Sequence, residues 1–310
     1  MAEIILQYPG KAAEKLQVFK ANLHTHSTTS DGKFTPQQQI DQYAARGYQV
    51  LSLTDHGKHN DLSKLDAKGM TLIPGMELHP MGPRDIKWHL LALNASPEIP
   101  EGFPENAQDI IDLVNSTGGM IYVAHPYWCG FTSAEVLSLN GVTGIEVSNT
   151  STRYIGKEFN MQIWDELLDA GKTYPALAVD DSHRPRDLFR NWTVICAKDN
   201  SVGSLVAALK SGNFYATQGP EFSKISFDGR IFEAEFSPCT SAILVSKRSK
   251  GVLGMVPAFE GEGTGEVVTS IRADVSEFAP DAYFRCQITD ASGKMAWSNP
   301  VTFPKKGELL

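Results

Sequence analysis

Segments that read as strands alternate with segments that read as helices over the first two-thirds of the chain. The run QVFKANLH (17–24) has the composition of a strand, and TPQQQIDQYAARGY (35–48) then reads as a helix. We expect Thr35 to be the N-cap of this helix, Pro36 its first residue and Gly47 the residue just past its end. Such alternation is typical of an α/β fold with a mostly parallel sheet.

The pattern continues up to about residue 217. Further strand segments are QVLSLTDH (49–56), MTLIPGMEL (70–78), WHLLALN (88–94), MIYVAHP (120–126), VTGIEVSN (142–149), YPALAVDDSH (174–183) and NWTVICAK (191–198). Helical segments are the short NDLSKLDAKG (60–69), NAQDIIDLVNSTGG (106–119), SAEVLSLNG (133–141), FNMQIWDELLDAG (159–171) and SVGSLVAALKSG (201–212). The strands are apolar on both faces, as in a sheet covered on both sides. A closed barrel of this kind needs roughly 200 residues, so the segment is long enough for a slightly reduced one.

The remainder of the chain has a different pattern. Runs such as KISFDGRIFEAEF (224–236) and SAILVSKRS (241–249) are short, alternate in polarity and are separated by glycine-containing turns. They predict a small antiparallel β-sandwich. The acidic stretch EGEGTGE (260–266) predicts a turn and not a phosphate-binding loop, because no helical pattern follows it. We therefore expect two domains, 1–218 and 219–310.

Charge and composition exclude several classes of function. The net charge of −8 argues against extended binding to nucleic acid, which needs a basic surface. No apolar run approaches the roughly 18 residues of a membrane span, and the N-terminus lacks the pattern of a signal peptide. The four cysteines are far apart and match no zinc or redox spacing. We expect a cytoplasmic protein with reduced cysteines and no membrane partner; its oligomeric state is left open.

Histidines and carboxylates recur where the expected strands end. All eight histidines lie between His24 and His183. The polar residues at the strand ends are His24, His26, Asp55, His56, Glu77, His125, Asp181 and His183, with His89 inside the fourth strand. Strand ends of a parallel barrel converge on one face, where active sites are built, and residues two apart in a strand point the same way. Imidazoles together with carboxylates are typical ligands of zinc, manganese or iron.

The ordered motifs resemble those of one known family. HTHSTTSDG, LTDH, PGMEL, HLLAL, AHP and VDDSH are similar to the motifs of the PHP (polymerase and histidinol phosphatase) metallo-hydrolase superfamily. LKSGNFYATQGPEF and AWSNP resemble its CehA/McbA-type, carbaryl-hydrolase-like branch, in which a small β domain follows the barrel. The resemblance implies a distorted (β/α)₇ TIM-like barrel that carries two or three divalent metal ions, manganese, zinc or iron.

The resemblance also implies which residues hold the metals. Its first metal would be held by His24, His26 and Asp181, with Glu77 bridging to a second held by His89 and His125; Asp31, His56 and His183 would hold a third, making a trinuclear metal site. Many family members have a histidine where this chain has Asp31. An aspartate there is similar to the phosphoesterase branch.

The implied chemistry is hydrolysis by a metal-bridging hydroxide, with Glu77 shared by two metals. Three divalent ions would outweigh the charges of three carboxylates and one hydroxide, which favours an anionic substrate. We expect a metal-dependent phosphoesterase acting on small phosphate esters, with nucleotides among the candidates.

Other residues are candidates for work on the substrate. Asp55 is expected to orient a ligating imidazole, with acid/base catalysis as the alternative. Arg184 is a candidate for clamping phosphate. The remaining substrate-binding candidates are Tyr127, Trp128, Arg153 and Lys157, each of which has loop packing or solvation as its alternative role.

Two other functions stay open at this point. One is a carbamate, ester or amide hydrolase of the carbaryl-hydrolase type that uses the same metals on a neutral substrate. The other is a non-catalytic PHP module that binds metal as a scaffold. Every expected ligand position is filled, which favours an enzyme.

Overall fold

The computed structural model describes residues 2–7, 12–95, 99, 106–255 and 267–303. The elements up to residue 217 are strands β1 (Glu3–Gln7), β2 (Glu14–Asn22), β3 (Val50–Leu51), β4 (Thr71–Leu72), β5 (Gly75–Leu78), β6 (Leu90–Leu93), β7 (Met120–Val123), β8 (Gly144–Asn149), β9 (Ala176–Val179), β10 (Trp192–Ala197) and β11 (Phe214–Thr217), with helices α1 (Pro36–Ala44), α2 (Ala107–Ser116), α3 (Pro126–Cys129), α4 (Ser133–Leu137), α5 (Met161–Asp169) and α6 (Val202–Ser211). Strands β12 (Phe222–Phe227), β13 (Ile231–Cys239), β14 (Ser241–Ser246), β15 (Gly251–Met255), β16 (Val268–Asp274), β17 (Tyr283–Thr289), β18 (Met295–Ser298) and β19 (Val301–Thr302) follow. The acidic turn expected at 260–266 lies outside the described residues.

Helix α1 begins where the sequence predicts. The Thr35 side chain accepts a hydrogen bond from Gln38 N at 3.2 Å, and the Gln38 side chain accepts one from Thr35 N at 2.9 Å. This reciprocal pair is a capping box, and Pro36 occupies the first turn. The helix buries Ile40 and Tyr43 in a cluster that includes Leu51 of β3. Its start directs the preceding turn, residues 27–34, toward the strand ends.

The sheet is mixed, which differs from the mostly parallel sheet that we expected. Strand β6 runs antiparallel to β5 and to β7, and β10 runs antiparallel to β2. The links that precede these two strands contain only the 3₁₀ turns Pro83–Asp85 and Pro185–Asp187. Two consecutive strands can run parallel only if a long crossover, usually a helix, connects them. A short link without a helix therefore makes the next strand run in the opposite direction. The expected helix at 60–69 is likewise reduced to the 3₁₀ turn Leu62–Lys64.

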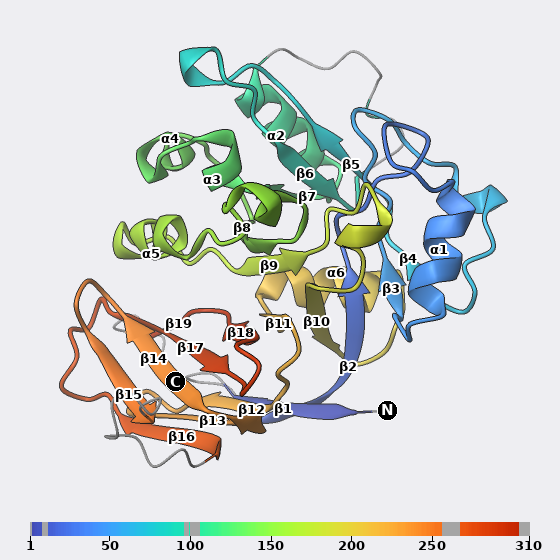
Figure 1. The fold of residues 1–310 in the computed structure, drawn as a ribbon. Helices are drawn as coiled ribbons and strands as arrows, with labels where there is room; N and C mark the ends of the chain where they lie inside the picture. The colour runs from blue at the N-terminus through green and yellow to red at the C-terminus, as the bar shows by residue number, and fades with distance from the viewer. Residues whose placement is uncertain (1, 8–11, 96–98, 100–105, 256–266, 304–310) are drawn as a thin grey trace.

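Two sheets approach each other to form a large, nearly closed β structure (Figure 1). Strands β5 to β9 form one sheet, and β2, β3 and β4 belong to the other. Isolated bridges join the two sheets at both margins, where Thr25 pairs with Ser182 and His56 pairs with Glu77. All four of these positions are ligand candidates or direct neighbours of one, so the margins where the sheets meet carry the candidate site.

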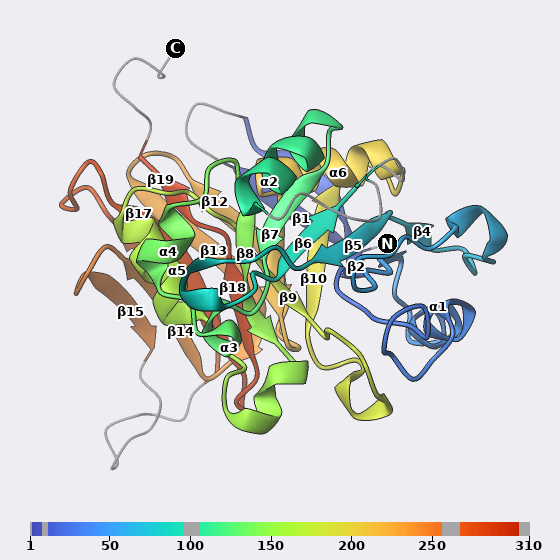
Figure 2. The same cartoon turned by 90° about the horizontal axis from the view of Figure 1, so that it is seen from above.

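The C-terminal strands pack around a hydrophobic core that they share with β1, β2, β10 and β11. Phe227 and Phe284 lie with ring centroids 5.6 Å apart in a cluster that also contains Phe232. Strand β1 pairs in parallel with β12 and antiparallel with β2, so the N-terminal strand lies between the two parts of the chain (Figure 1). In the view from above, the C-terminal strands and helix α1 lie on opposite sides of the molecule (Figure 2). No described helix is long and apolar enough to span a lipid bilayer.

Candidate metal centre

Four buried ligand atoms converge near the end of β2. His24 and His26 follow that strand, Glu77 lies in β5 and Asp181 follows β9. His24 Nε2 lies 3.1 Å from His26 Nε2, as expected for two residues that share one side of an extended chain. Asp181 Oδ1 lies 3.3 Å from the His24 nitrogen and 3.0 Å from the His26 nitrogen. Glu77 Oε2 lies 3.4 Å from each of the two. All four side chains are buried, so their polar atoms are removed from solvent.

These spacings match the edges of a metal coordination shell. Ligands about 2.1 Å from a zinc-sized ion lie about 3.0–3.4 Å apart, depending on whether the geometry is octahedral or tetrahedral. Asp181 Oδ1 is buried and accepts no well-aligned hydrogen bond from any described residue. A buried carboxylate oxygen without a partner is costly. A cation at the centre of the four atoms would satisfy it, so the donor set fits a divalent metal ion.

A second group of ligand atoms shares Glu77. His89 Nδ1 lies 2.7 Å from Glu77 Oε1, and His125 Nε2 lies 3.4 Å from the same oxygen. His125 Nε2 is also 3.7 Å from Asp181 Oδ2. The two oxygens of Glu77 therefore face different groups of imidazoles, which is the arrangement that a bridging carboxylate requires.

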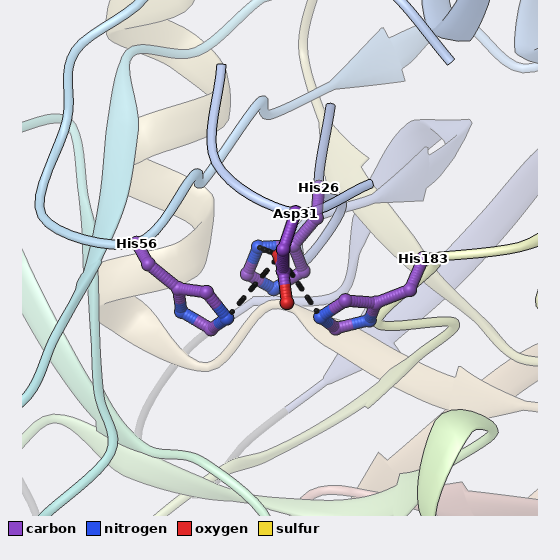
Figure 3. A group of neighbouring side chains, drawn as sticks. All are labelled: His26, Asp31, His56 and His183. Carbon is purple, nitrogen blue, oxygen red and sulfur yellow. Dashed lines mark ion pairs between the residues drawn. The ribbon is translucent and has the colours of Figure 1, made fainter. Parts of the chain in front are cut away.

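A third group lies nearer the surface, around Asp31 (Figure 3). Asp31 Oδ1 is 3.5 Å from His56 Nε2 and 3.5 Å from His183 Nε2. His26 Nδ1 lies 3.9 Å from it, so His26 faces the first group with one nitrogen and the third group with the other. The Asp31 side chain is 55% exposed, in contrast with the buried carboxylates of the other two groups.

Electrostatics keep the central carboxylates ionised. Burial opposes the ionisation of Glu77, but neighbouring imidazoles, led by His24, outweigh it and hold its pKa well below its usual range. The same balance lowers the pKa of Asp181. Burial lowers the pKa of His24, yet the carboxylates around it prevail and raise that pKa well above its ordinary value. Burial lowers the pKa of His89 to about 4, which leaves this imidazole neutral and able to act as a ligand.

Asp55 does not orient a ligating imidazole as we expected. Its carboxylate accepts hydrogen bonds from Ser27 N at 2.7 Å, Ser27 Oγ at 2.7 Å and Ser30 Oγ at 2.6 Å. Ser30 N and Asn60 Nδ2 donate to it as well, at 3.1 and 2.7 Å. Both oxygens are occupied, and these hydrogen bonds lower the pKa of the carboxyl although burial opposes them. Asp55 therefore organises the turn between His26 and Asp31.

A cavity of about 510 Å³ opens above the ligand groups. Of the substrate-binding candidates, Arg184 and Trp128 line it, and Lys33 and Arg186 add cationic side chains that sequence reasoning did not single out. The Trp128 ring lies 5.4 Å from His89 and 5.1 Å from His125, measured between centroids.

The other three substrate-binding candidates are not among the described residues that line the cavity. Lys157 Nζ lies 5.0 Å from the centroid of the Tyr127 ring, and the Arg153 guanidinium lies 4.3 Å from the centroid of the Tyr154 ring. These side chains contact neighbouring rings, although Ser151 and Thr152 beside Arg153 do line the cavity. Residue type alone does not determine the course of a loop.

Glu146 is a buried residue at the centre that sequence reasoning missed. It lies in β8 and its Oε1 is 2.6 Å from His24 Nδ1. The signal was present in the sequence: a charged side chain within the apolar run VTGIEVSN needs a buried partner.

Known proteins resemble this chain in part of its sequence and in its fold. No protein-family model matches the chain. Over 88 residues it is 36% identical to the 3′,5′-nucleoside bisphosphate phosphatase of Chromobacterium violaceum, a match covering 26% of this chain and 29% of that protein. Its fold is similar to a two-domain protein from Bacteroides vulgatus containing a predicted PHP-like metal-dependent phosphoesterase, with a TM-score of 0.53 and 15% identity over 97% of this chain and 98% of that chain.

Proposed function

Since the chain has a PHP-like metal-dependent phosphoesterase as its structural neighbour and a phosphatase as its curated relative, we propose that it hydrolyses small phosphate esters with divalent metal ions as cofactors. The observation that carries this proposal is the convergence of His24, His26, Glu77 and Asp181 with the spacing of a coordination shell. Glu77 and Asp181 also line the cavity, which would give a substrate access to metal ions held there.

We assign the ligands in three groups, as the motifs predict. His24, His26 and Asp181 would hold the first ion, Glu77 would be shared with a second held by His89 and His125, and Asp31, His56 and His183 would hold a third. Bound ions of manganese, zinc or iron would polarise the phosphoryl group and lower the pKa of water.

The chain's own side chains favour a phosphate over a neutral substrate. Lys33, Arg184 and Arg186 bring three cationic side chains to the cavity. Guanidinium groups pair well with phosphate oxygens, and a neutral carbamate offers no charge to them. The Trp128 ring provides a flat apolar wall on which the remainder of the ester could pack.

We infer the architecture in the same terms. Residues 1–218, with strands β2 to β11, would correspond to the distorted PHP barrel, and β12 to β19 to the small β domain expected over 219–310. The C-terminal domain would buttress the barrel through the β11–β18 pairing.

Turnover assays test the proposed function. The protein, reconstituted separately with Mn²⁺, Zn²⁺ and Fe²⁺, would be offered phosphate monoesters, phosphate diesters and aryl carbamates. We expect release of phosphate from monoesters, its loss on chelation and its loss in Glu77→Gln, while the exposed Glu235→Gln on β13 behaves like the wild type. Turnover of carbamates alone would contradict the phosphatase proposal. Tight metal binding without turnover of any ester would favour a scaffold.

A further inference from the structure

One buried carboxylate, that of Glu146, is linked by hydrogen bonds to three ligand candidates: to His24 and His125 directly, and to Asp181 through Asn149. Glu146 has no solvent-accessible surface and lies in β8, which lines the candidate site beside β9. It is not among the expected ligands, and its two oxygens face different partners. Because an ionised carboxylate only accepts hydrogen bonds, each partner must donate to it.

The first partner is His24, whose Nδ1 lies 2.6 Å from Glu146 Oε1. When the imidazole is neutral, as a metal ligand must be, this contact places its ring proton on Nδ1 and leaves the lone pair on Nε2. His24 Nε2 is the atom that faces Glu77 and Asp181. Hydrogen bonding at one imidazole nitrogen fixes the tautomer and the ring orientation at the other.

The second partner is the backbone of His125. His125 N donates to Glu146 Oε2 at 2.9 Å. His125 has φ 28 and ψ 56, a conformation that a residue with a side chain rarely adopts. Such a backbone persists only where its surroundings hold it, and the Glu146 carboxylate supplies one such constraint directly at the strained residue.

The third connection runs through Asn149 to Asp181. Asn149 Nδ2 lies 2.8 Å from Glu146 Oε2 and 3.2 Å from Asp181 Oδ2. Asp181 also has a positive φ of 49. The amide therefore occupies one oxygen of Asp181, which leaves Oδ1 directed at His24 and His26.

We propose that Glu146, with Asn149, is the positioning residue of the metal centre: it sets the tautomer of His24 and holds His125 and Asp181 in place for a divalent cation. The proposal rests on the metal-binding part of the proposed function and not on the phosphatase activity. It is therefore tested by metal affinity, and a protein that binds metal without hydrolysing phosphate would leave it standing.

The test is the variant Glu146→Gln, which keeps the size of the side chain. A glutamine cannot accept hydrogen bonds at both ends, so either His24 or the His125–Asn149 pair meets an NH₂ group. We expect the dissociation constant for Zn²⁺ and for Mn²⁺, measured by calorimetry or chelator competition, to rise about 10–100-fold. The metal-free protein should retain its thermal unfolding midpoint within a few degrees.

Two further variants make the result decisive. Asp165→Asn breaks an ion pair with Arg285 away from the centre, so it should lower the unfolding midpoint without changing metal affinity. Asn149→Ala keeps Glu146 and removes its tie to Asp181, and we expect a smaller loss of metal affinity. If Glu146→Gln does not fold, Asn149→Ala decides. If Glu146→Gln, or Asn149→Ala in its place, folds and binds metal with wild-type affinity, the proposal is overturned. An equal loss of metal affinity in Asp165→Asn would overturn it as well.

Discussion

Individual carboxylates of this protein divide into those that face the ligand groups and those that shape the backbone around them. Asp31, Glu77 and Asp181 face imidazole nitrogens, whereas Asp55 accepts hydrogen bonds from Ser27 and Ser30 of one turn and from Asn60. Strand alternation predicted which side chains share a face, and His24 and His26 lie side by side as it predicts. It could not separate Asp55 from a ligand, because the difference lies in the course of a turn.

Asp55→Asn should weaken the fold. The asparagine NH₂ group cannot accept hydrogen bonds from the Ser27 and Ser30 donors. A buried donor left without an acceptor costs about 1–3 kcal/mol. We expect the free energy of unfolding, measured in urea, to fall by about 2–3 kcal/mol. Asp61→Asn is the matched control: this exposed carboxylate caps a single 3₁₀ turn through Ser63, and its variant should stay near the wild type. Equal stability of both variants would show that the turn does not depend on Asp55.

Asp31→Asn should affect metal content selectively. Asp31 is exposed and belongs to the outer group alone, while His24 and Glu77 belong to the buried groups. Elemental analysis after dialysis should therefore show the loss of about one metal ion per chain, with the tightly held ions retained. Loss of all metal from Asp31→Asn would contradict the assignment of a separate outer site.

At the scale of elements, the sequence predicted where strands lie better than which way they run. The runs 88–94 and 191–198 are strands, as expected, but β6 and β10 are antiparallel to their neighbours. Hydrophobic pattern reports burial and not direction. The direction follows from the short links before each strand, and the partner of β1 depends on residues that lie far along the chain.

Glu158 joins three elements and gives a pH-dependent prediction. Its Oε1 accepts from Gln218 Nε2 at 3.0 Å, after β11, and from Asn191 Nδ2 at 3.5 Å, before β10. Burial raises its pKa in the folded protein. A raised folded pKa favours the protonated form, so its contribution to stability is complete at low pH and is lost as the pH rises through the folded pKa.

Glu158→Gln should therefore unfold at a higher temperature than the wild type at pH 8, and the difference should shrink toward pH 4. Glu135→Gln is the control with the opposite sign. The Arg84 guanidinium lowers the pKa of Glu135 to about 2, so ionised Glu135 stabilises the fold above its ordinary pKa and this variant should lose stability at pH 8. Thermal melts at the two pH values measure both, and a Glu158→Gln midpoint below the wild type at pH 8 would contradict the argument.

At the scale of the whole molecule, an ion pair connects strand β17 of the C-terminal part to helix α5. Arg285 on β17 is 2% exposed and donates to both oxygens of Asp165 on α5, at 2.7 and 2.6 Å. The guanidinium also lies 4.8 Å from the centroid of the Trp164 ring. The sequence offered no sign of this pair, because its members are far apart in the chain.

Asp165→Asn leaves a buried guanidinium without its charge partner. Because Asp165 is partly exposed, we expect a loss of about 2–3 kcal/mol, somewhat below the value for a fully buried pair. Adding Arg285→Met should recover part of the loss, since the uncompensated charge is removed. Chemical denaturation of the single and double variants measures this, and a double variant less stable than Asp165→Asn would contradict the prediction.

The pairing of β1 with β12 also bears on how the protein is made. Strand β1 is synthesised before the other described strands, and β12, whose Lys224 pairs with Ile5, is synthesised only after β2 to β11. Until then one edge of β1 has no strand to bind, and an unpaired edge invites contact with other chains. Completion of β12 thus covers the open edge of β1, and a chain whose synthesis stopped before β12 would leave that edge exposed to other chains.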